Sequence, residues 1–417
     1  MKENLQKLST DPYKGVRDFY PDDMAVQNYI YGIWKKTLQS FGYEEYAASV
    51  LEPADLYRAK SGQELVNEQT YTFKDRGDRE VTIRPEMTPT VARMVAAHKR
   101  ELALPLRWFS IPNLFRYEQP QRGRLREHWQ LNADIFGLDN VEAEIEIIYL
   151  AYQIMKNFGA KDSDFEIRLN DRGLLQAEID KRISNEDSRI NAIKLLDKKE
   201  KMPSEEFNKK WKEISGSDFD LNIEPNESII KIISALNKSG VNNVKFSPTL
   251  TRGFDYYTGI VFEIFDTNPD NKRSLFGGGR YDDLTSLFGG DKVPAVGFGM
   301  GDVTMRDFLE THKLLPEIKS LTKLHVCTLD VKFIAPAEEI AMKLREKGLN
   351  VSVNLTDKKV GDQIGWASKH HIPYIVCIGD EEVRTGKMKL KNLSTSNERE
   401  IIVDEIVKEV SNNEKVE

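Results

Sequence analysis

The sequence predicts an α+β protein that carries a helical insertion and a separate C-terminal α/β domain. Two hairpin patterns, at 71–85 and 107–137, indicate antiparallel strands in the N-terminal part of the chain. The last ~95 residues alternate strand and helix, which is typical of a mostly parallel sheet covered by helices. We therefore expect three domains: a first domain formed by 1–161 and 245–320, a lysine- and glutamate-rich helical domain inserted at 162–244, and a third domain at 321–417.

Composition excludes several classes of protein. The chain has 417 residues, enough for two or three domains, and a formal net charge of −7, so a nucleic acid would have to be bound through local basic patches. Cys327 and Cys377 lie in apolar runs and are expected to be buried thiols in a reducing compartment. The histidines and cysteines show no zinc-ligand spacing.

The N-terminus is charged and polar, which is not typical of a signal peptide. No apolar run approaches the roughly 20 residues of a membrane span. We therefore expect a cytoplasmic enzyme with no membrane partner.

Several elements are expected before the second hairpin. Apolar residues from Val26 to Leu38 have helical spacing, and Gly42 follows where a helix C-terminus favours glycine. The remaining elements expected in this region are a strand at 46–51, a short helix at 54–60, the hairpin at 71–85 and a helix at 89–100.

The stretch from Arg107 to Gly137 is the strongest indication of a functional site. It predicts two long strands joined by a polar, arginine-rich loop at 119–126, and the outgoing strand places Arg116 and Glu118 on one face. The returning strand alternates between an apolar set and a polar set: Trp129, Leu131, Ala133 and Ile135 against His128, Gln130, Asn132 and Asp134. We interpret the polar set as a floor beneath a small anionic ligand, and a solvated hairpin in a charged protein is the alternative.

The pattern after this hairpin predicts a long amphipathic helix at 140–158, followed by the insertion, whose charged segments are interpreted as solvated surface. Strands resume at Thr251, and proline and lysine mark a linker near 315–323. The elements expected in the last domain are strands at 324–330, 349–355 and 373–380, helices at 336–347, 359–369 and from Val403, and a hairpin at 382–393.

Arginines and glycines indicate a nucleotide ligand. Arg116, Arg124 and Arg252 are candidates for planar, bidentate contacts with phosphate oxygens. Two glycine groups, 277–279 and 297/299/301, would let the backbone approach a ligand, although tight turns would explain them as well. Neither group matches a P-loop or a dinucleotide fingerprint.

The other candidates are polar groups near the expected floor. Three carboxylates could hold an amine, an imidazole or a metal, and three tyrosines could add hydroxyls or simply belong to the core: Glu86, Glu118, Asp134, Tyr256, Tyr257 and Tyr281. No nucleophile has a neighbouring base. The set therefore favours catalysis by positioning and charge neutralisation, as in phosphoryl or nucleotidyl transfer.

Six segments, in this order along the chain, resemble histidyl-tRNA synthetases, a family of class II aminoacyl-tRNA synthetases. They are YKGVRDFYP, IRPEMT, FRYEQPQRGRLREHWQLNADIFG, TRGFDYYTG, GGGRYDDL and VPAVGFGMG. The third resembles motif 2, the last resembles the start of motif 3, and TRGFDYYTG with GGGRYDDL is the most specific pair. The C-terminal βαβ unit resembles the family's anticodon-binding domain, so the resemblance covers nearly the whole chain.

The resemblance implies a six-stranded antiparallel sheet flanked by helices, acting in a homodimer. It implies that L-histidine attacks the α-phosphate of ATP, supplied with Mg²⁺, and that the adenylate then acylates the 3′ end of tRNA(His). Arg116 and Arg252 would be the catalytic residues, gripping the α-phosphate and the histidine carboxylate. Arg252 would supply charge that other class II enzymes partly take from a metal, and no metal ligands are expected on the protein.

The resemblance also implies binding roles for further residues. Those for ATP are Arg116, Glu118, Arg124, Arg252, Gly299 and Gly301. Those for histidine, besides the two catalytic arginines, are Glu86, Thr88 and Gln130 at the α-amino group, Asp134 and Tyr257 at the imidazole, and Tyr256 and Tyr281 in the pocket wall. A buried hydrogen-bonding pocket of this kind can reject other side chains by roughly 10⁴–10⁵, so no editing domain is required.

Three positions depart from the family pattern. Ser49 stands where a proline is expected late in motif 1, and Asp134 stands where glutamate is common. The helix of motif 3 usually begins GxxR, with the arginine on the γ-phosphate, but Thr304 occupies that position here and Arg306 would point elsewhere. Either another cation covers the γ-phosphate or ATP binds more weakly.

The main hypothesis is a histidine–tRNA ligase. The first alternative is a non-catalytic paralogue, similar to the histidine-binding regulatory subunit of the first enzyme of histidine biosynthesis. That paralogue normally lacks the anticodon domain and loses residues of motif 2 and TRGFDYYTG, all of which this chain keeps, so only Thr304 favours it. An RNA-binding structural protein would explain the C-terminal domain but not the polar floor.

Overall fold

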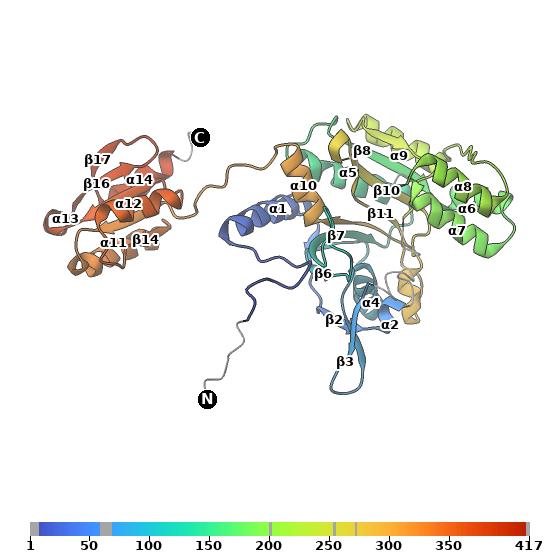
Figure 1. Ribbon diagram of the computed structural model, residues 1–417, viewed down its shortest axis with the longest axis horizontal. Helices are drawn as coiled ribbons and strands as arrows, with labels where there is room; N and C mark the ends of the chain where they lie inside the picture. Colours follow the sequence, from blue (N-terminus) through green and yellow to red (C-terminus); the bar gives the residue numbers. More distant parts are fainter. Residues whose placement is uncertain (1–7, 59–68, 200–201, 253–255, 272, 414–417) are drawn as a thin grey trace. The chain divides into compact units, whose positions relative to one another are not determined.

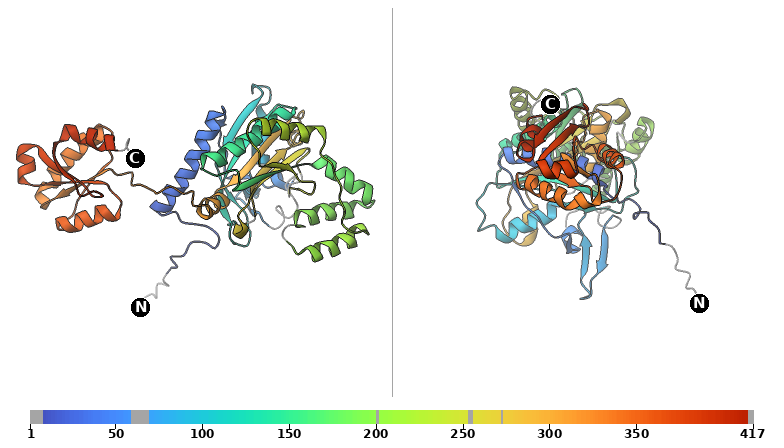
Figure 2. Two further views of the ribbon diagram at one scale, coloured as in Figure 1. Left: turned by 90° about the horizontal axis from the view of Figure 1, so that it is seen from above. Right: turned by 90° about the vertical axis from the view of Figure 1, so that its left-hand side faces the viewer.

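The computed structural model describes residues 8–58, 69–199, 202–252, 256–271 and 273–413. Two compact units divide the chain, unit 1 at Met1–Leu315 and unit 2 at Pro316–Glu417 (Figures 1 and 2). The expected segment TRGFDYYTG is only partly covered, since residues 253–255 lie outside the described residues.

A nine-stranded sheet is the centre of the described part of unit 1, in the order β1-β5-β7-β12-β11-β10-β8-β9, with β6 paired to β7. The six strands in the middle run antiparallel, so the expected six-stranded antiparallel sheet is confirmed: β5 (Leu106–Ser110), β7 (Glu127–Phe136), β12 (Ala295–Gly301), β11 (Ser274–Arg280), β10 (Ile260–Asp266) and β8 (Phe165–Asp171). Short parallel strands, β1 (Glu44–Glu45) and β9 (Val244–Phe246), lie at the two edges, and β6 is Asn113–Phe115.

One face of this sheet is apolar and carries the main core. Leu131, Ala133 and Ile135 are fully buried in it because alternate residues of β7 point to the same side. The helix α5 (Val141–Asn157) packs on β7 and β12, and α1 (Pro21–Ser40) packs on α5. The helix α10 (Asp302–Thr311) follows β12 directly and joins the same core through Met305 and Phe308.

A small sheet of β2 (Leu51–Pro53), β4 (Glu80–Ile83) and β3 (Tyr71–Lys74) carries a hairpin that projects from unit 1 (Figure 1). Its turn is held by Asp75, whose carboxylate accepts hydrogen bonds from the backbone of Gly77 and Arg79. The expected helices nearby are present as α2 (Asp55–Arg58) and α4 (Thr88–His98), although Ala59 and Lys60 lie outside the described residues.

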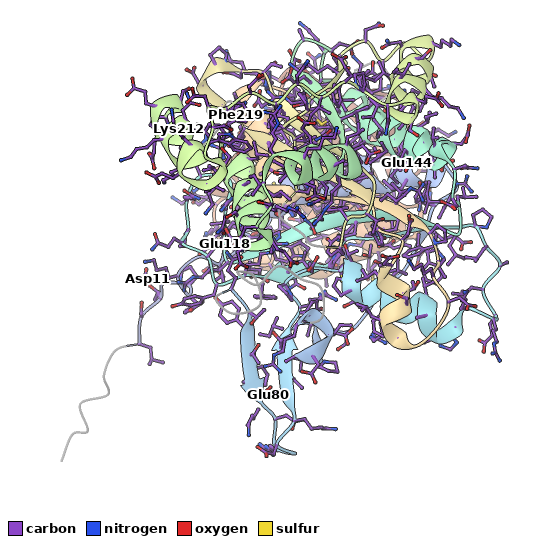
Figure 3. The ribbon with its side chains drawn as sticks, turned by 90° about the vertical axis from the view of Figure 1, so that its right-hand side faces the viewer. Asp11, Glu80, Glu118, Glu144, Lys212 and Phe219 are labelled. Carbon is purple, nitrogen blue, oxygen red and sulfur yellow. The ribbon has the colours of Figure 1, made fainter. Side chains whose placement is uncertain are left out.

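The described residues between β8 and β9 form four α-helices: α6 (Arg172–Arg182), α7 (Glu186–Asp197), α8 (Ser204–Ser215) and α9 (Glu227–Lys238). The first three share a small core of their own around Phe207 and Trp211. Figure 3 labels Lys212 and Phe219 on this part, and Glu80 on the projecting hairpin. The helix α9 differs, because its Ile229, Ile232 and Leu236 join the main core and it packs on α5.

Unit 2 contains the expected βαβ pattern around a five-stranded sheet of order β14-β13-β15-β16-β17 among the described residues. The first three strands are parallel and the last two antiparallel. The elements are β13 (Leu324–Thr328), α11 (Ile334–Glu346), β14 (Val351–Val353), α12 (Val360–Lys369), β15 (Tyr374–Ile378), α13 (Asp380–Thr385), β16 (Lys387–Asn392), β17 (Glu398–Ile402) and α14 (Val403–Asn413). Cys327 and Cys377 pair in register on β13 and β15 as free thiols. In neither unit does a described helix combine the length and apolarity that a bilayer crossing needs.

Two predicted strands of unit 1 are wrong. Residues 46–50 separate β1 from β2, and the carbonyls of Ala48 and Ser49 accept from the guanidinium of Arg84 at 2.8 and 3.3 Å instead of joining a ladder. The outgoing strand of the second hairpin breaks between β5 and β6, at Pro112. Proline has no N–H to donate to a ladder, so a strand readily ends there.

The predicted hairpin at 382–393 is also wrong in its first half, which forms the helix α13. The Glu382 carboxylate accepts from the backbone N–H of Gly379 at 2.9 Å, and three acidic residues in the first turn suit the positive end of the helix dipole. Gly386, with φ +69°, ends the helix. The hairpin forms later, between β16 and β17.

Candidate active site

The face of the central sheet opposite the main core is polar and rich in glycine. Register places Asp134, Asn132 and Gln130 of β7 opposite Gly297, Gly299 and Gly301 of β12, and residues directly opposite share a face. Farther across, Gly299 and Gly297 face Gly277 and Gly279 of β11, and Gly277 faces Glu263 of β10. We call this face, from Gln130, Asn132 and Asp134 through the glycines to Glu263, the polar floor.

The glycines lie within strands and not in tight turns, and their role is to clear space. A Cβ on Gly297 would lie 2.0 Å from Oδ1 of Asp134, and one on Gly299 would lie 2.9 Å from the end of the Gln130 side chain. On β11, a Cβ on Gly277 would lie 3.1 Å from the Arg252 guanidinium. Polar side chains of neighbouring elements therefore lie flat across the glycines.

Asp134 is the buried acid of the polar floor, with 3% of its surface exposed. The Tyr281 hydroxyl donates to its Oδ1 at 2.5 Å, whereas Oδ2 is buried without a hydrogen-bond partner among the described residues. Burial raises the pKa of Asp134 to about 7, and the Tyr281 hydrogen bond opposes that rise. The site thus holds a carboxyl group that a nitrogen donor would stabilise in its charged form.

A run of contacts leads from Asp134 to the loop before α4. The rings of Tyr281 and Tyr256 are 5.9 Å apart, and the Tyr256 hydroxyl donates to Oε2 of Glu86 at 3.1 Å and lies 3.5 Å from Oγ1 of Thr88. Glu86 and both tyrosines are buried. Burial, followed by the nearby Glu86 carboxylate, raises the pKa of Tyr256 well above its ordinary value, so its hydroxyl stays a donor.

Arg252 lies over the glycines of β11. Its Nη1 donates to Oε1 of Glu263 at 2.7 Å and its Nη2 donates to the carbonyl of Gly277 at 3.3 Å. The side chain is 15% exposed, and its Nε is buried without a hydrogen-bond partner among the described residues. Burial opposes its charge, but Glu263 and Tyr257 more than compensate and the pKa of Arg252 is raised.

Arg116 and the loop at 119–126 border this cluster. The Arg116 Nε donates to the carbonyl of Pro85 at 2.9 Å, which places the side chain next to Glu86. On the loop, Arg124 is exposed and its Nη1 lies 3.5 Å from Oε2 of Glu118. The structure therefore brings seven predicted site residues together with Arg116, and places Arg124 and Glu118 as a pair on the loop: Glu86, Thr88, Asp134, Arg252, Tyr256, Tyr257 and Tyr281.

Sequence comparison decides the family. The profile described as "Histidyl-tRNA synthetase" matches residues 15–210 and 205–303, and the profile described as "Anticodon binding domain" matches 323–413. The chain belongs to the histidyl-tRNA synthetase family. It is 44% identical to the histidine–tRNA ligase of Leptospira biflexa over 95% of this chain and 96% of that one, and 36% identical to that of Thermoplasma volcanium over 96% and 98%.

The fold is shared with solved members of the family. The histidyl-tRNA synthetase of Nostoc sp. PCC 7120 superposes with a TM-score of 0.81 at 20% identity, covering 98% of this chain and all of that one. At that identity the likeness concerns the fold alone. It agrees with the antiparallel sheet and flanking helices described above.

The start of α10, which follows the segment that resembles motif 3, is held by a buried aspartate. Asp302, fully buried at the N-terminus of α10, accepts from Arg17 at 2.7 Å, from Gln27 at 2.9 Å and from the backbone N–H of Trp129 at 2.9 Å. Thr304, in the place of the family arginine, donates to the carbonyl of Leu275 at 2.9 Å. The segment YKGVRDFYP, which contains Arg17, therefore helps to hold motif 3 against motif 2.

Arg306 is directed away from the site, as the helical spacing predicted. Its Nη2 contacts Asp23 at 3.0 Å and its Nε contacts Glu310 at 2.8 Å. It therefore does not stand in for the absent motif 3 arginine.

The sequence reasoning missed Glu263, the partner of Arg252. A signal existed, because a glutamate inside the apolar strand IVFEIFD needs a buried partner. No described group of three or more histidine, cysteine, aspartate or glutamate side chains could hold a metal ion.

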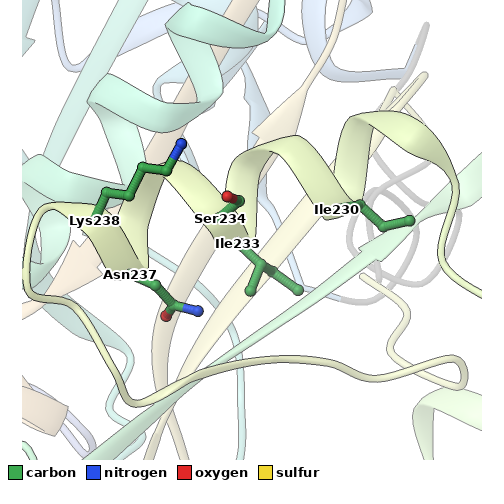
Figure 4. Close-up of a pocket in the computed structure, with 5 residues that line it drawn as sticks. All are labelled: Ile230, Ile233, Ser234, Asn237 and Lys238. Atoms are coloured by element: carbon green, nitrogen blue, oxygen red, sulfur yellow. The ribbon is translucent and has the colours of Figure 1, made fainter.

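A surface hollow elsewhere in unit 1 does not belong to this site. It is lined by residues of α9 alone, Ile230, Ile233, Ser234, Asn237 and Lys238 (Figure 4). Ile230 is 55% exposed, and only one of the lining side chains is charged. This hollow lacks the convergent polar groups that the polar floor provides.

Proposed function

We propose that this chain is a histidine–tRNA ligase that activates L-histidine with ATP and transfers it to tRNA(His). In the first step a histidine carboxylate oxygen bonds to the α-phosphorus of ATP and pyrophosphate leaves. In the second step a ribose hydroxyl at the tRNA 3′ end attacks the carbonyl carbon of histidyl-adenylate and AMP leaves. The observation that carries the proposal is the connected run Asp134–Tyr281–Tyr256–Glu86 beside Arg252, in a chain of this family.

Histidine would bind between the two buried carboxylates of this run. Asp134 has one oxygen that no described residue contacts by a hydrogen bond, and this oxygen would accept an imidazole N–H, with Tyr257 and Tyr281 shaping the pocket. Glu86, Thr88 and Gln130 would hold the α-amino group. A side chain lacking the imidazole donor would leave the Asp134 oxygen unpaired, which is the physical basis of selection.

The phosphates would lie over the glycines of the polar floor. Arg252 and Arg116 would face the α-phosphate and the histidine carboxylate. Their positive charge would reduce the electrostatic repulsion between these two anions. Glu118, Arg124, Gly299 and Gly301 would complete the ATP site. Because Arg252 is already held by Glu263 and by the Gly277 carbonyl, it needs little reorganisation when the substrates bind.

The remaining expectations belong to the same proposal. The residues at 323–413 would bind the anticodon region of tRNA(His), and the active form would be a cytoplasmic homodimer. ATP would act with Mg²⁺. The three-domain division, with an insertion at 162–244, is part of the proposal, and the separate small core of α6–α8 supports it.

Histidine-dependent exchange of pyrophosphate into ATP, followed by charging of tRNA(His), tests the function. Folded protein that gives no exchange would contradict it. Arg252→Ala is expected to abolish exchange while the oligomeric state is kept. Arg107→Ala is the matched control, since Arg107 also pairs with a glutamate, Glu146 at 2.6 Å, but outside the polar floor. Exchange by the Arg252 variant would show that this arginine has been misassigned.

A further inference from the structure

Arg273 lies just before β11, next to the start of α10 and the loop at 119–126. Its Nη1 donates to the carbonyl of Arg122 at 2.9 Å and lies 3.8 Å from Oδ2 of Asp307 on α10. The side chain is 27% exposed, so the guanidinium is accessible without being fully solvated. It thus joins three segments that are far apart in the sequence.

Gly123 shows how closely these segments meet. A Cβ on Gly123 would lie 2.2 Å from Nη1 of Arg273 and 3.7 Å from Cγ2 of Thr304. The guanidinium of Arg273 and the side chain of Thr304 therefore lie against the same point of the loop. Gly123 also has φ +78°, so the residue is glycine for two independent reasons.

Thr304 leaves this space open. Its hydroxyl donates to the carbonyls of Leu275 and Gly301, at 2.9 and 3.1 Å, which turns the side chain onto the backbone of β11 and the first turn of α10. A longer side chain at position 304 would meet the loop near Gly123, where the Arg273 guanidinium also lies. The small residue at 304 and the cation at 273 are therefore complementary.

Arg273 also immediately precedes β11, the strand that carries the phosphate face of the proposed ATP site. Glu263 accepts from Arg252 Nη1 at 2.7 Å and from the hydroxyl of Ser274, so the residue after Arg273 shares a carboxylate with Arg252. Gly277 is the fourth residue after Arg273, so their backbones are at most roughly 13 Å apart at the rise of an extended chain. Two arginine side chains anchored at these points can face different phosphates of one triphosphate.

The neighbouring arginines have other partners or other places in the proposed ATP site. Arg122 donates to Oδ1 of Asp307 through its Nε at 2.7 Å. Arg124, which lies 3.5 Å from Glu118, already has a place in the proposed ATP site together with that glutamate. Arg306 pairs with Asp23 and Glu310. Arg273 contacts Asp307 only at 3.8 Å, which leaves its donors better placed for an incoming anion.

We propose that Arg273 binds the terminal phosphate of ATP and the departing pyrophosphate, in the place of the arginine that Thr304 replaces in motif 3. The inference rests on the proposed function and names the phosphate-binding residue of that site. A planar guanidinium fits two phosphate oxygens, and negative charge grows on the leaving pyrophosphate as the α-phosphate is attacked. On binding, Arg273 exchanges part of its contact with the Arg122 carbonyl for phosphate oxygens.

Comparison of ATP with AMP binding tests the proposal, because AMP lacks the phosphates that Arg273 would meet. Isothermal titration of the full chain with each nucleotide measures the two dissociation constants. Arg273→Ala should raise the Kd for ATP at least tenfold and leave the Kd for AMP within twofold of the parent value. Arg306→Ala, an arginine of the same region with other partners, should change neither. If Arg273→Ala weakened the binding of ATP and of AMP equally, the residue would only support the loop at 119–126 and the inference would be wrong. An unchanged affinity for ATP would also overturn the inference.

A positional exchange sharpens the test. Arg273→Ala combined with Thr304→Arg restores an arginine to the family position, so part of the lost ATP affinity should return, with AMP again unaffected. A double variant no better than Arg273→Ala would overturn the claim that one residue replaces the other. Loss of the proposed function is distinguishable, since it would appear as absence of histidine-dependent exchange in the parent protein, whatever the ATP-to-AMP ratio of the variants.

Discussion

Replacing Asp134 with asparagine should remove a loss of stability that the parent protein shows as pH rises, and should weaken histidine activation. The folded carboxyl group has a pKa of about 7 against an ordinary value of 3.8. Because the folded pKa is raised, the protonated form is the one the fold favours. Stability is therefore lost as pH rises from about 4 to about 7, where the unfolded chain has released a proton that the folded chain still holds.

The size of the effect follows from these two values. At 1.36 kcal/mol per pKa unit, the ionised carboxylate costs the fold on the order of 4 kcal/mol at pH 8 and on the order of 2 kcal/mol at pH 5. Asparagine has no such dependence, although its amide brings a pH-independent cost of its own at the position of Oδ2, which has no partner among the described residues. The stability difference between variant and parent should therefore increase by about 2–3 kcal/mol between pH 5 and pH 8, whatever that constant cost is.

Urea unfolding at the two pH values measures this difference. Four of the five tryptophans, Trp34, Trp108, Trp129 and Trp211, lie in unit 1, so intrinsic fluorescence reports mainly on the unit that contains Asp134. Saturating histidine should stabilise the parent and leave the asparagine variant unchanged, and pyrophosphate exchange by the variant should fall with an increased KM for histidine. An equal stability difference at pH 5 and pH 8 would refute the reasoning about the buried carboxyl.

Three further outcomes are expected. Gly297→Ala should lower the free energy of unfolding by about 1–3 kcal/mol and abolish exchange, because its Cβ would lie 2.0 Å from an oxygen of Asp134. Gly299→Ala should only raise the KM for histidine. Urea midpoints and exchange kinetics distinguish the two variants. Tyr281→Phe removes a hydrogen bond that lowers the pKa of Asp134, so the pH dependence of the histidine KM should move to higher pH. Arg280→Ala leaves the buried carboxylate of Glu144 without its bidentate partner, and should cost about 3–5 kcal/mol by denaturant unfolding, part of it recovered by adding Glu144→Gln.

Alternation along the chain was enough to predict the polar floor. Gln130, Asn132 and Asp134 occupy every second position, and so do the glycines at 297, 299 and 301. Two strands with period-two patterns had to present those sets on one face each, and pairing placed them opposite one another. The sequence could not reveal that the glycines make room for the side chains of β7, because that depends on which strands are neighbours.

Predictions failed where a distant or local side chain competed for backbone groups. The stretch at 46–50 has the composition of a strand, but Arg84, more than 30 residues later, takes two of its carbonyls. The first half of the predicted hairpin at 382–393 became a helix because Glu382 caps its N-terminus. No local sequence pattern indicated a role for Arg273. Its proposed role depends on its contact with Arg122, about 150 positions away in the sequence.

Three buried polar atoms without hydrogen-bond partners among the described residues belong to the proposed site or lie beside it. Buried polar groups in native proteins are nearly always hydrogen-bonded, so each exception calls for an explanation. Oδ2 of Asp134, Nε of Arg252 and Oδ2 of Asp307 are buried without hydrogen-bond partners among the described residues. Other such atoms lie elsewhere in the chain, so the property alone does not define a site.

Two of these three groups match chemical groups of the proposed substrates. The carboxylate of Asp134 suits an imidazole N–H, and the guanidinium of Arg252 suits a carboxylate or phosphate oxygen. The Asp307 carboxylate contacts both Arg122 and Arg273. If a phosphate drew Arg273 away from the Arg122 carbonyl, Asp307 would remain paired with Arg122. In the proposed function, histidine would supply an imidazole N–H to Asp134, and the substrates would supply carboxylate or phosphate oxygens to Arg252.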